Sequence, residues 1–238
     1  MRPSIRFVTV ASMTAVLAGC ATPGLGGGPT GATGTNSDPV ASVTATFGNA
    51  AGPGSAEPTS QTLSYRVTYD WAVPSTEAKV NNPLSLPLTG PIPLPYLVGV
   101  YVGDHPEGNP AYERISFYFR GGFPSYNLQY VQSVLSEGQG ELVNVPGNAV
   151  LRIGFTEAQA HDASGSSTIS AQPPTSIGFN TLKGYGFAGD FEAHLTYALG
   201  IQVAPGSDQV VPIRAGELTK SDGAGGTFYV VHVDVKKA

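Results

Sequence analysis

The sequence predicts an all-β fold, a mainly antiparallel β-sandwich preceded by a signal peptide and a disordered tether. Three observations support this prediction. From residue 62 onward, apolar and polar side chains alternate over many short runs, which is the period of a half-buried strand. Turn-forming residues cluster between these runs, and no window of eleven or more residues carries a helical apolar stripe. The chain also holds 31 Gly and 20 Pro, which favours frequent turns.

Composition excludes several functional classes. The 238 residues fit one domain or a modest two. Only 12% are charged, against about 25% in ordinary soluble domains. A net charge of −5 with 12 basic residues argues against nucleic-acid binding, which needs clustered Lys and Arg. One cysteine excludes a disulfide scaffold and a Cys-rich zinc site, and no apolar run reaches the roughly 18 residues of a membrane-spanning helix.

Residues 1–19 have the pattern of a bacterial signal peptide. Arg2 and Arg6 supply a positive region, and the largely apolar run Phe7–Ala18 is too short to span a bilayer. The run ends in Leu17-Ala18-Gly19-Cys20, which resembles the lipobox that directs a lipid to the Cys sulfur and cleavage just before it. The sequence therefore predicts Cys20 as the lipidation site and first residue of the mature chain.

Lipid attached to Cys20 is expected to hold the protein at a membrane. Each buried CH₂ contributes about 0.8 kcal/mol, so two or three acyl chains such as palmitate anchor a protein where one is marginal. Removing Arg2 and Arg6 takes the net charge from −5 to −7, so anionic headgroups give no attraction. We therefore expect a lipid-anchored protein on the extracytoplasmic face of the cell membrane.

The mature chain is expected to begin with a flexible tether at residues 20–60. Residues 21–60 hold nine Gly, five Pro, two acids and one aromatic, which is too little apolar material to offset the entropy of ordering. As a coil, this segment would span about 35 Å. It is interpreted as a spacer between the membrane and the folded part.

Strands are predicted wherever the period is two. In the first run Leu63, Tyr65, Val67, Tyr69 and Trp71 alternate with polar residues, which predicts a strand with these five on its buried face. The further runs are 98–102, 115–119, 126–130, 151–155 and 229–235. Five prolines make Asn81–Tyr96 a loop, an edge or a polyproline segment. We expect residues 61–97 to pack on a main domain at 98–238.

Four long motifs follow one another in the main domain. They read VGVYVGDHPEG (Val98–Gly108), YERISFYFRGGFPSYNLQYV (Tyr112–Val131), VPGNAVLRIGFTEAQAHD (Val145–Asp162) and AGDFEAHLTYALGIQV (Ala188–Val203), followed by PIRAGEL and YVVHVDV. Together they resemble the AMIN-like domain of actinobacterial lipoproteins, a relative of the AMIN modules on cell-wall amidases and secretion proteins. The resemblance implies a β-sandwich in the cell envelope and no catalytic residues. Family members usually read D-R-V-V-F where this chain reads Glu113-Arg114-Ile115-Ser116-Phe117.

One group of residues could bind a metal. Asp190, Glu192 and His194 would share one face of a strand, and carboxylates with an imidazole suit a hard or borderline cation. Neighbouring strands could add His161 and Asp162, or His232 and Asp234. The same face could instead serve an enzyme that acts on wall polymers, or it could be a plain solvated face.

A second group could bind a ligand on the surface of the sheet. Its members are Arg114, Tyr118, Arg120, Tyr126 and Tyr130, and Tyr101 and His105 would join if the strands at 98–102 and 115–119 pair as a hairpin. Aromatic faces and a guanidinium suit carbohydrate or peptide recognition. The same residues could equally be cross-strand packing in a sandwich core.

Two GxGxxG strings, at 26–31 and 184–189, lack the strand-then-helix context of a dinucleotide site and are interpreted as accidents of a Gly-rich chain. No GxSxG, HExxH or CxxC is present, and no cofactor is predicted. The leading hypothesis is a non-catalytic binding protein for cell-wall glycan or an envelope protein partner. The alternatives are a wall-acting or metal-dependent enzyme and a structural interaction lipoprotein.

Overall fold

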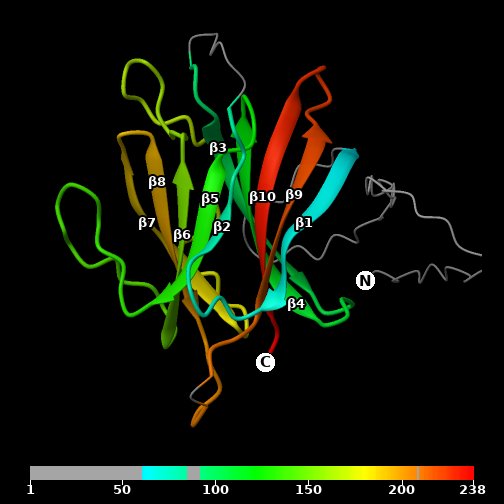
Figure 1. Ribbon diagram of the computed structural model, residues 1–238, viewed down its shortest axis with the longest axis vertical. Helices are drawn as coiled ribbons and strands as arrows, with labels where there is room; N and C mark the ends of the chain where they lie inside the picture. The colour runs from blue at the N-terminus through cyan, green and yellow to red at the C-terminus, as the bar shows by residue number, and fades with distance from the viewer. Residues whose placement is uncertain (1–60, 85–91, 208) are drawn as a thin grey trace, which may run out of the picture. The chain divides into compact units, whose positions relative to one another are not determined.

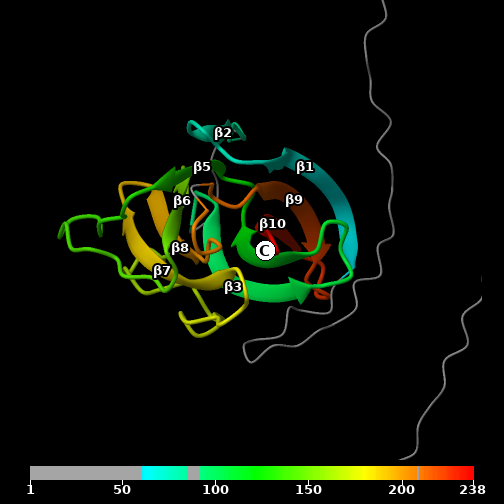
Figure 2. The same ribbon diagram turned by 90° about the horizontal axis from the view of Figure 1, so that it is seen from below.

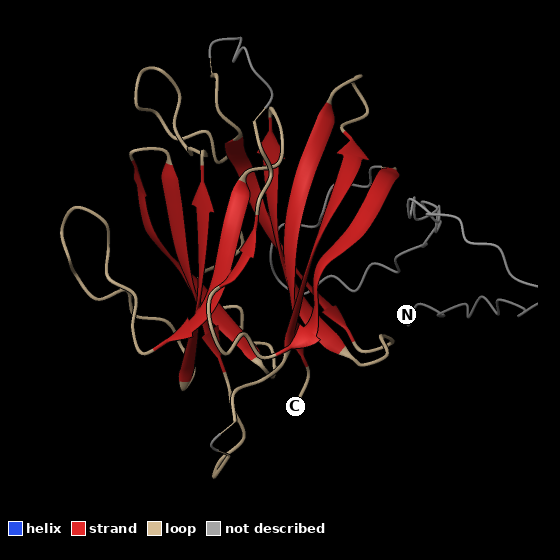
Figure 3. Cartoon of the chain, viewed as in Figure 1, coloured by secondary structure: helices blue, strands red, loops and turns tan. Residues whose placement is uncertain are grey.

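Two antiparallel sheets account for the strands of the computed structural model, which describes residues 61–84, 92–207 and 209–238 (Figure 1). The predicted signal peptide, lipidation site and tether lie outside the described residues. Within the described ranges there is no helix, and hence none long and apolar enough to cross a membrane (Figure 3). The prediction of an all-β fold is confirmed.

The two sheets contain five strands each. The strands are β1 Thr62–Ala72, β2 Ala78–Val80, β3 Tyr96–His105, β4 Tyr112–Arg120, β5 Ser125–Val131, β6 Ala149–Thr156, β7 Leu182–Phe191, β8 His194–Ile201, β9 Ile213–Ser221 and β10 Thr227–Lys236. Sheet A has the order β1-β9-β10-β4-β3, and sheet B has the order β2-β5-β6-β8-β7. Figure 2 shows the two sheets end-on, with sheet B on the left and sheet A on the right.

The core lies between the two sheets and follows directly from the alternation in the sequence. Ile115, Phe117 and Phe119 of β4 point inward from sheet A and are fully buried. Across the interface, the Phe117 ring lies 5.1 Å from Phe155 and 5.0 Å from Tyr197, in tilted or edge-on packing. Such aromatic pairs contribute about 0.5–1.5 kcal/mol beyond the area they bury. The predicted runs at 115–119, 126–130, 151–155 and 229–235 are therefore strands that build the core.

Strand β1 forms where it was predicted, but its burial was predicted wrongly. Leu63, Tyr65 and Val67 are 55%, 41% and 44% exposed. The reason is that β1 is the edge of sheet A, with its register to β9 shifted after Val67 and again after Tyr69. A bulge reverses the face on which later residues lie, so Tyr69 packs against the core while the earlier apolar residues do not.

The second GxGxxG string lies within β7 and has a packing role, so its interpretation as an accident was wrong. A Cβ on Gly184 would lie 2.5 Å from the carbonyl oxygen of Thr175, and one on Gly186 would lie 2.6 Å from Val143 Cγ1. Glycine therefore lets the loop between β5 and β6 and the loop before β7 lie directly on the strand. The described parts of Asn81–Tyr96 contain no strand before Tyr96, as the prolines predict.

Candidate functional site

The structure divides the predicted ligand-binding residues between the two sheets. Arg114, Tyr118 and Arg120 lie on β4, on the face of sheet A turned away from the core, because their neighbours on β4 fill the core. Strands β3 and β4 pair as the expected hairpin, which brings Tyr101 to 4.7 Å from the Tyr118 ring. Tyr126 and Tyr130 lie on β5 of sheet B. The five residues therefore do not form one surface.

Tyr126 and Tyr130 are bound into the sandwich. Tyr126 is 2% exposed and its hydroxyl shares a hydrogen bond of 2.6 Å with Thr68 Oγ1. The Tyr130 hydroxyl donates to the carbonyl oxygen of Val211 at 2.7 Å. Burial raises the pKa of both phenols above the ordinary value, so both hydroxyls stay protonated. The structure thus gives these two residues packing roles.

The outer face of sheet A carries a buried network of charges. Arg114 Nε and Arg214 Nη2 donate to the two oxygens of Asp234, at 2.5 Å and 2.6 Å, and the Asp234 carboxylate is fully buried. Arg214 also lies over the Trp71 ring, 4.7 Å from its centroid. Lys220 Nζ donates to the Tyr118 hydroxyl at 2.6 Å. The polar groups of Arg114 and Tyr118 are therefore hydrogen-bonded to other side chains of the protein.

Arg120 is the most accessible of the three β4 residues. Its side chain is 27% exposed, pairs with Asp222 at 2.7 Å and lies 4.1 Å from the centre of the Phe228 ring. A binding role for this residue stays a prediction.

His232 lies next to this network and is also fully buried. Neither ring nitrogen has a hydrogen-bond partner among the described residues, and the Tyr65 ring stacks on the imidazole at 5.7 Å. Burial, reinforced by the positive charge of Arg114, holds the pKa of His232 well below its usual value. The imidazole is therefore neutral at physiological pH.

The proposed metal face is interrupted by a turn, so the expectation of one continuous strand was wrong. Asp190 lies near the end of β7, Glu192 lies in the turn, and His194 begins β8. Glu192 and Ala193 have φ of 48° and 63°, the left-handed region that reverses the chain in a tight hairpin. Among the residues described here, no three His, Cys, Asp or Glu side chains lie close enough together to hold a metal ion.

His161, which was expected to be able to lie near Asp190, does contact it. His161 donates from Nδ1 to Asp190 Oδ2 at 2.5 Å, and the backbone N–H of Ala160 donates to the same oxygen at 2.8 Å. Asp162 does not join them, because its carboxylate accepts hydrogen bonds from Ser164 and Ser166 in its own loop. His232 and Asp234 lie in the other sheet.

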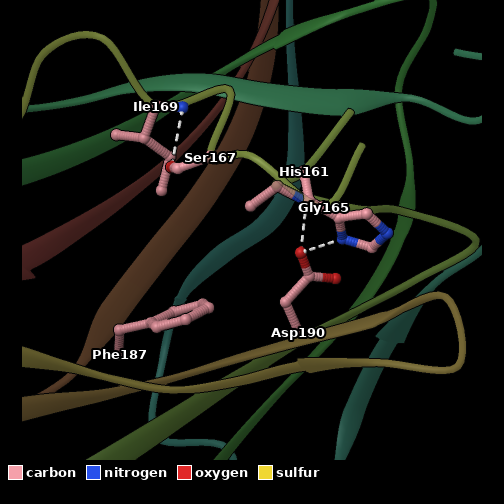
Figure 4. Close-up of a pocket in the computed structure, with 7 residues that line it drawn as sticks. His161, Gly165, Ser167, Ile169, Phe187 and Asp190 are labelled. Atoms are coloured by element: carbon pink, nitrogen blue, oxygen red, sulfur yellow. Dashed lines mark hydrogen bonds and ion pairs between the residues drawn. The ribbon is translucent and has the colours of Figure 1, made fainter. Parts of the chain in front are cut away.

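Asp190 and His161 line an open pocket of about 300 Å³ between β7 and the loop that follows β6 (Figure 4). Its lining residues are Ala160, His161, Gly165, Ser167, Ile169, Phe187 and Asp190. This volume is at the low end of ligand pockets, which suits a single small ring rather than a large molecule.

The polar groups of the pocket do not form a hydrolytic triad. In Figure 4 the imidazole of His161 points away from Ser167, whose hydroxyl accepts a hydrogen bond from the Ile169 N–H at 3.2 Å. A serine nucleophile would need to contact the imidazole directly. The polar side chains are held in place by their hydrogen bonds, and no serine nucleophile contacts the imidazole that would activate it.

Phe187 forms an apolar wall of the pocket, and it was not among the site residues predicted from the sequence. Its ring packs against Tyr197 at 5.1 Å yet remains 46% exposed, because β7 is the edge of sheet B. An exposed ring beside a carboxylate and a hydroxyl suits a sugar, whose apolar face stacks while its hydroxyls hydrogen-bond. Phe187 and Tyr185 occupy equivalent positions in the alternating pattern, so the sequence does not show that Tyr185 is buried and Phe187 exposed.

Comparison with known proteins agrees with the fold. The AMIN-like domain family matches residues 95–219, which run from just before β3 to near the end of β9. No curated protein and no solved structure shows significant similarity to the chain. Strands β1, β2 and β10 lie outside the matched residues and complete the two sheets. The chain therefore belongs to the AMIN-like domain family, whose members are generally non-catalytic binding modules of the cell envelope.

Proposed function

We propose that this protein is a lipoprotein, anchored through Cys20 on the extracytoplasmic face of the membrane, whose β-sandwich binds cell-wall glycan without catalysis. Family membership supports a binding role in the envelope. The lipobox-like Leu17-Ala18-Gly19-Cys20 supports the anchor. The single observation that carries the choice of glycan is the exposed Phe187 ring beside Asp190 and Ser167 in the pocket.

The lining of the pocket favours a neutral sugar over an anion. Among the described residues that line the pocket there is no Lys or Arg, which argues against an anion. Asp190 Oδ2 is held by His161 Nδ1 and the Ala160 N–H, whereas Asp190 Oδ1 has no hydrogen-bond partner among the described residues. Ile169 and Phe187 supply the apolar area on which a sugar ring can pack.

Replacing Phe187 with alanine is expected to weaken wall binding about tenfold, the effect of losing about 1.4 kcal/mol of ring stacking. The measurement is co-sedimentation of the Cys20→Ala chain with isolated cell walls. Phe191→Ala is the matched control, because Phe191 lies on the same strand, is 58% exposed and does not line the pocket. Failure of the parent chain to enrich in the wall pellet would contradict the proposal, as would equal losses in the two variants.

Replacing Cys20 with alanine is expected to move the protein from the membrane fraction to the soluble fraction. The mature chain has a net charge of −7, so no electrostatic attraction to anionic lipid replaces the lost acyl chains. Fractionation of cells followed by immunoblotting checks this. Persistent membrane association of Cys20→Ala would rule out the lipid as the anchor.

A further inference from the structure

Strand β10 carries a histidine that is buried without a hydrogen-bond partner. His232 has no exposed surface, and neither Nδ1 nor Nε2 has a partner among the described residues. The ring lies directly on the backbone of β9, since a Cβ on Gly216 would lie 2.7 Å from the imidazole Cε1 and 2.8 Å from Nε2. Buried polar side chains nearly always have a partner, so an imidazole left without one points to a role beyond packing.

Strand β1 covers this imidazole. The Tyr65 ring stacks on it with 15° between the two ring planes. Strand β1 is an edge of sheet A and pairs with β9 and with no other strand of the described chain, and its register to β9 shifts at three points. Strands β4, β9 and β10 are paired on both sides, and the opposite edge strand, β3, is also bonded by residues 159–171. An edge strand with an interrupted ladder opens more readily than its neighbours, so water reaches the imidazole most easily when β1 moves away.

The charges around the imidazole oppose its protonation while β1 is in place. Ionisable groups face it from each strand packed against it, namely Tyr65 on β1, Arg114 and Tyr118 on β4, Arg214 and Lys220 on β9, and Asp234 on β10. Tyr101 of β3 lies one strand further away, opposite Ser116. Asp234 is the one acid in this set, and both arginines already bind it. Burial, followed by the charge of Arg114, therefore holds the pKa of the closed-state imidazole well below its ordinary value.

We propose that His232 makes the attachment of β1 to sheet A sensitive to acid, so that uptake of one proton by the imidazole releases the strand. With β1 released, water reaches the imidazole, which then binds a proton with its ordinary pKa of about 6.5. The open form binds more protons than the closed form, so acidification below about pH 6.5 favours opening. Opening also separates Arg66 of β1 from the buried Glu217, which it contacts at 2.7 Å in the closed form. The proposal is independent of the glycan pocket, which lies on sheet B and the loop after β6.

Hydrogen exchange of the Cys20→Ala chain, corrected for the intrinsic exchange rate at each pH, tests this. The opening equilibrium constant reported by the amides of β1 is expected to rise about tenfold between pH 7.5 and pH 5.5, because one proton binds with a pKa of about 6.5 in the open form. The amides of β6, in the middle of sheet B, should show no such rise. An opening constant of β1 that does not depend on pH, or an equal rise in β6, would overturn the proposal.

Replacing His232 with leucine is expected to remove the pH dependence of β1 opening. The substitution deletes the titrating group without breaking a hydrogen bond to any described residue. His194→Leu is the matched control, because His194 is exposed at the start of β8 in the other sheet, and it should retain the tenfold rise. Persistence of the rise in His232→Leu would show that another group takes up the proton.

A second variant leaves the histidine in place and removes its cover. In Tyr65→Ala, NMR titration of the imidazole C–H signals is expected to show His232 gaining its proton at a higher pH than in the parent chain. Leu63→Ala is the control, because Leu63 lies on the same strand and is 55% exposed, and its His232 signal should titrate as in the parent. The same His232 titration in the parent and in Tyr65→Ala would contradict the role given to β1.

Discussion

Replacing Asp234 with alanine is expected to lower the free energy of unfolding by about 3–5 kcal/mol, as for other broken buried ion pairs. The reason is that Asp234 accepts hydrogen bonds from both Arg114 and Arg214 and is fully buried. Its loss leaves two guanidinium groups without a counter-charge on the outer face of sheet A. Urea denaturation followed by fluorescence checks this, because the single tryptophan, Trp71, lies against Arg214.

The Asp234 carboxylate is also expected to make the folded state less stable in acid. Burial by itself would raise the pKa of Asp234, but the guanidinium groups of Arg114 and Arg214, which donate hydrogen bonds to its carboxylate, outweigh burial and hold the pKa below its usual value. A carboxyl with a lower pKa in the folded state stabilises the fold above its unfolded pKa of about 3.9. That stabilisation is lost as the pH falls through the folded pKa. The parent should therefore lose stability below about pH 4, and Asp234→Ala should lack this component.

The control for Asp234→Ala is Glu77→Ala. Glu77 pairs with Lys79 and Arg152 near the surface, at 2.9 Å and 3.0 Å, and exposed pairs contribute little. We expect its unfolding curve to lie close to that of the parent chain. Similar curves for Asp234→Ala and Glu77→Ala would show that the buried network does not support sheet A.

The sequence was sufficient to predict the fold class and most of the strands. Alternation placed β4, β5, β6 and β10 because each has one face in the core, and burial of that face requires apolar residues at every second position. Alternation failed at β1, where the same pattern lies at a sheet edge with Leu63 and Tyr65 exposed. The alternation of apolar and polar residues within one strand does not show which elements cover that strand. Whether its apolar side chains are buried therefore depends on the position of the strand in the sheet.

The candidate site was predicted only in part, for reasons of local geometry. Asp190 and His161 were among the residues considered, and they do meet in the pocket. Glu192 and His194 were grouped with Asp190 because nothing in the composition of the turn signals a reversal. Non-glycine residues seldom adopt positive φ, yet Glu192 and Ala193 both do. Phe187 was missed because its exposure results from the edge position of β7.

Glu113 is a buried acid with a structural role. It stands at a position where resemblance to the family leads one to expect an aspartate, and it points toward the interior at one end of the sandwich. Its carboxylate accepts hydrogen bonds from the backbone N–H groups of Asn180, Thr181 and Leu182, at 2.9, 2.9 and 2.6 Å. These three donors lead into β7, the strand that carries Phe187 and Asp190. The acid therefore fixes the start of the strand on which the pocket is built.

Replacing Glu113 with alanine is expected to destabilise the protein by about 2 kcal/mol or more, because the buried backbone donors of Thr181 and Leu182, left without acceptors, cost about 1–3 kcal/mol each. The loss should be local first: hydrogen exchange measured by NMR should show lower protection for the amides of residues 180–182 than for those of β6. Glu141→Ala, an exposed glutamate on the loop between β5 and β6, is the control and should leave both regions unchanged. Since β7 carries one wall of the pocket, Glu113→Ala should also weaken wall binding. Unchanged protection at 180–182 would mean that the loop before β7 is held by other contacts, such as the Ala238 N–H bond to Thr181 Oγ1.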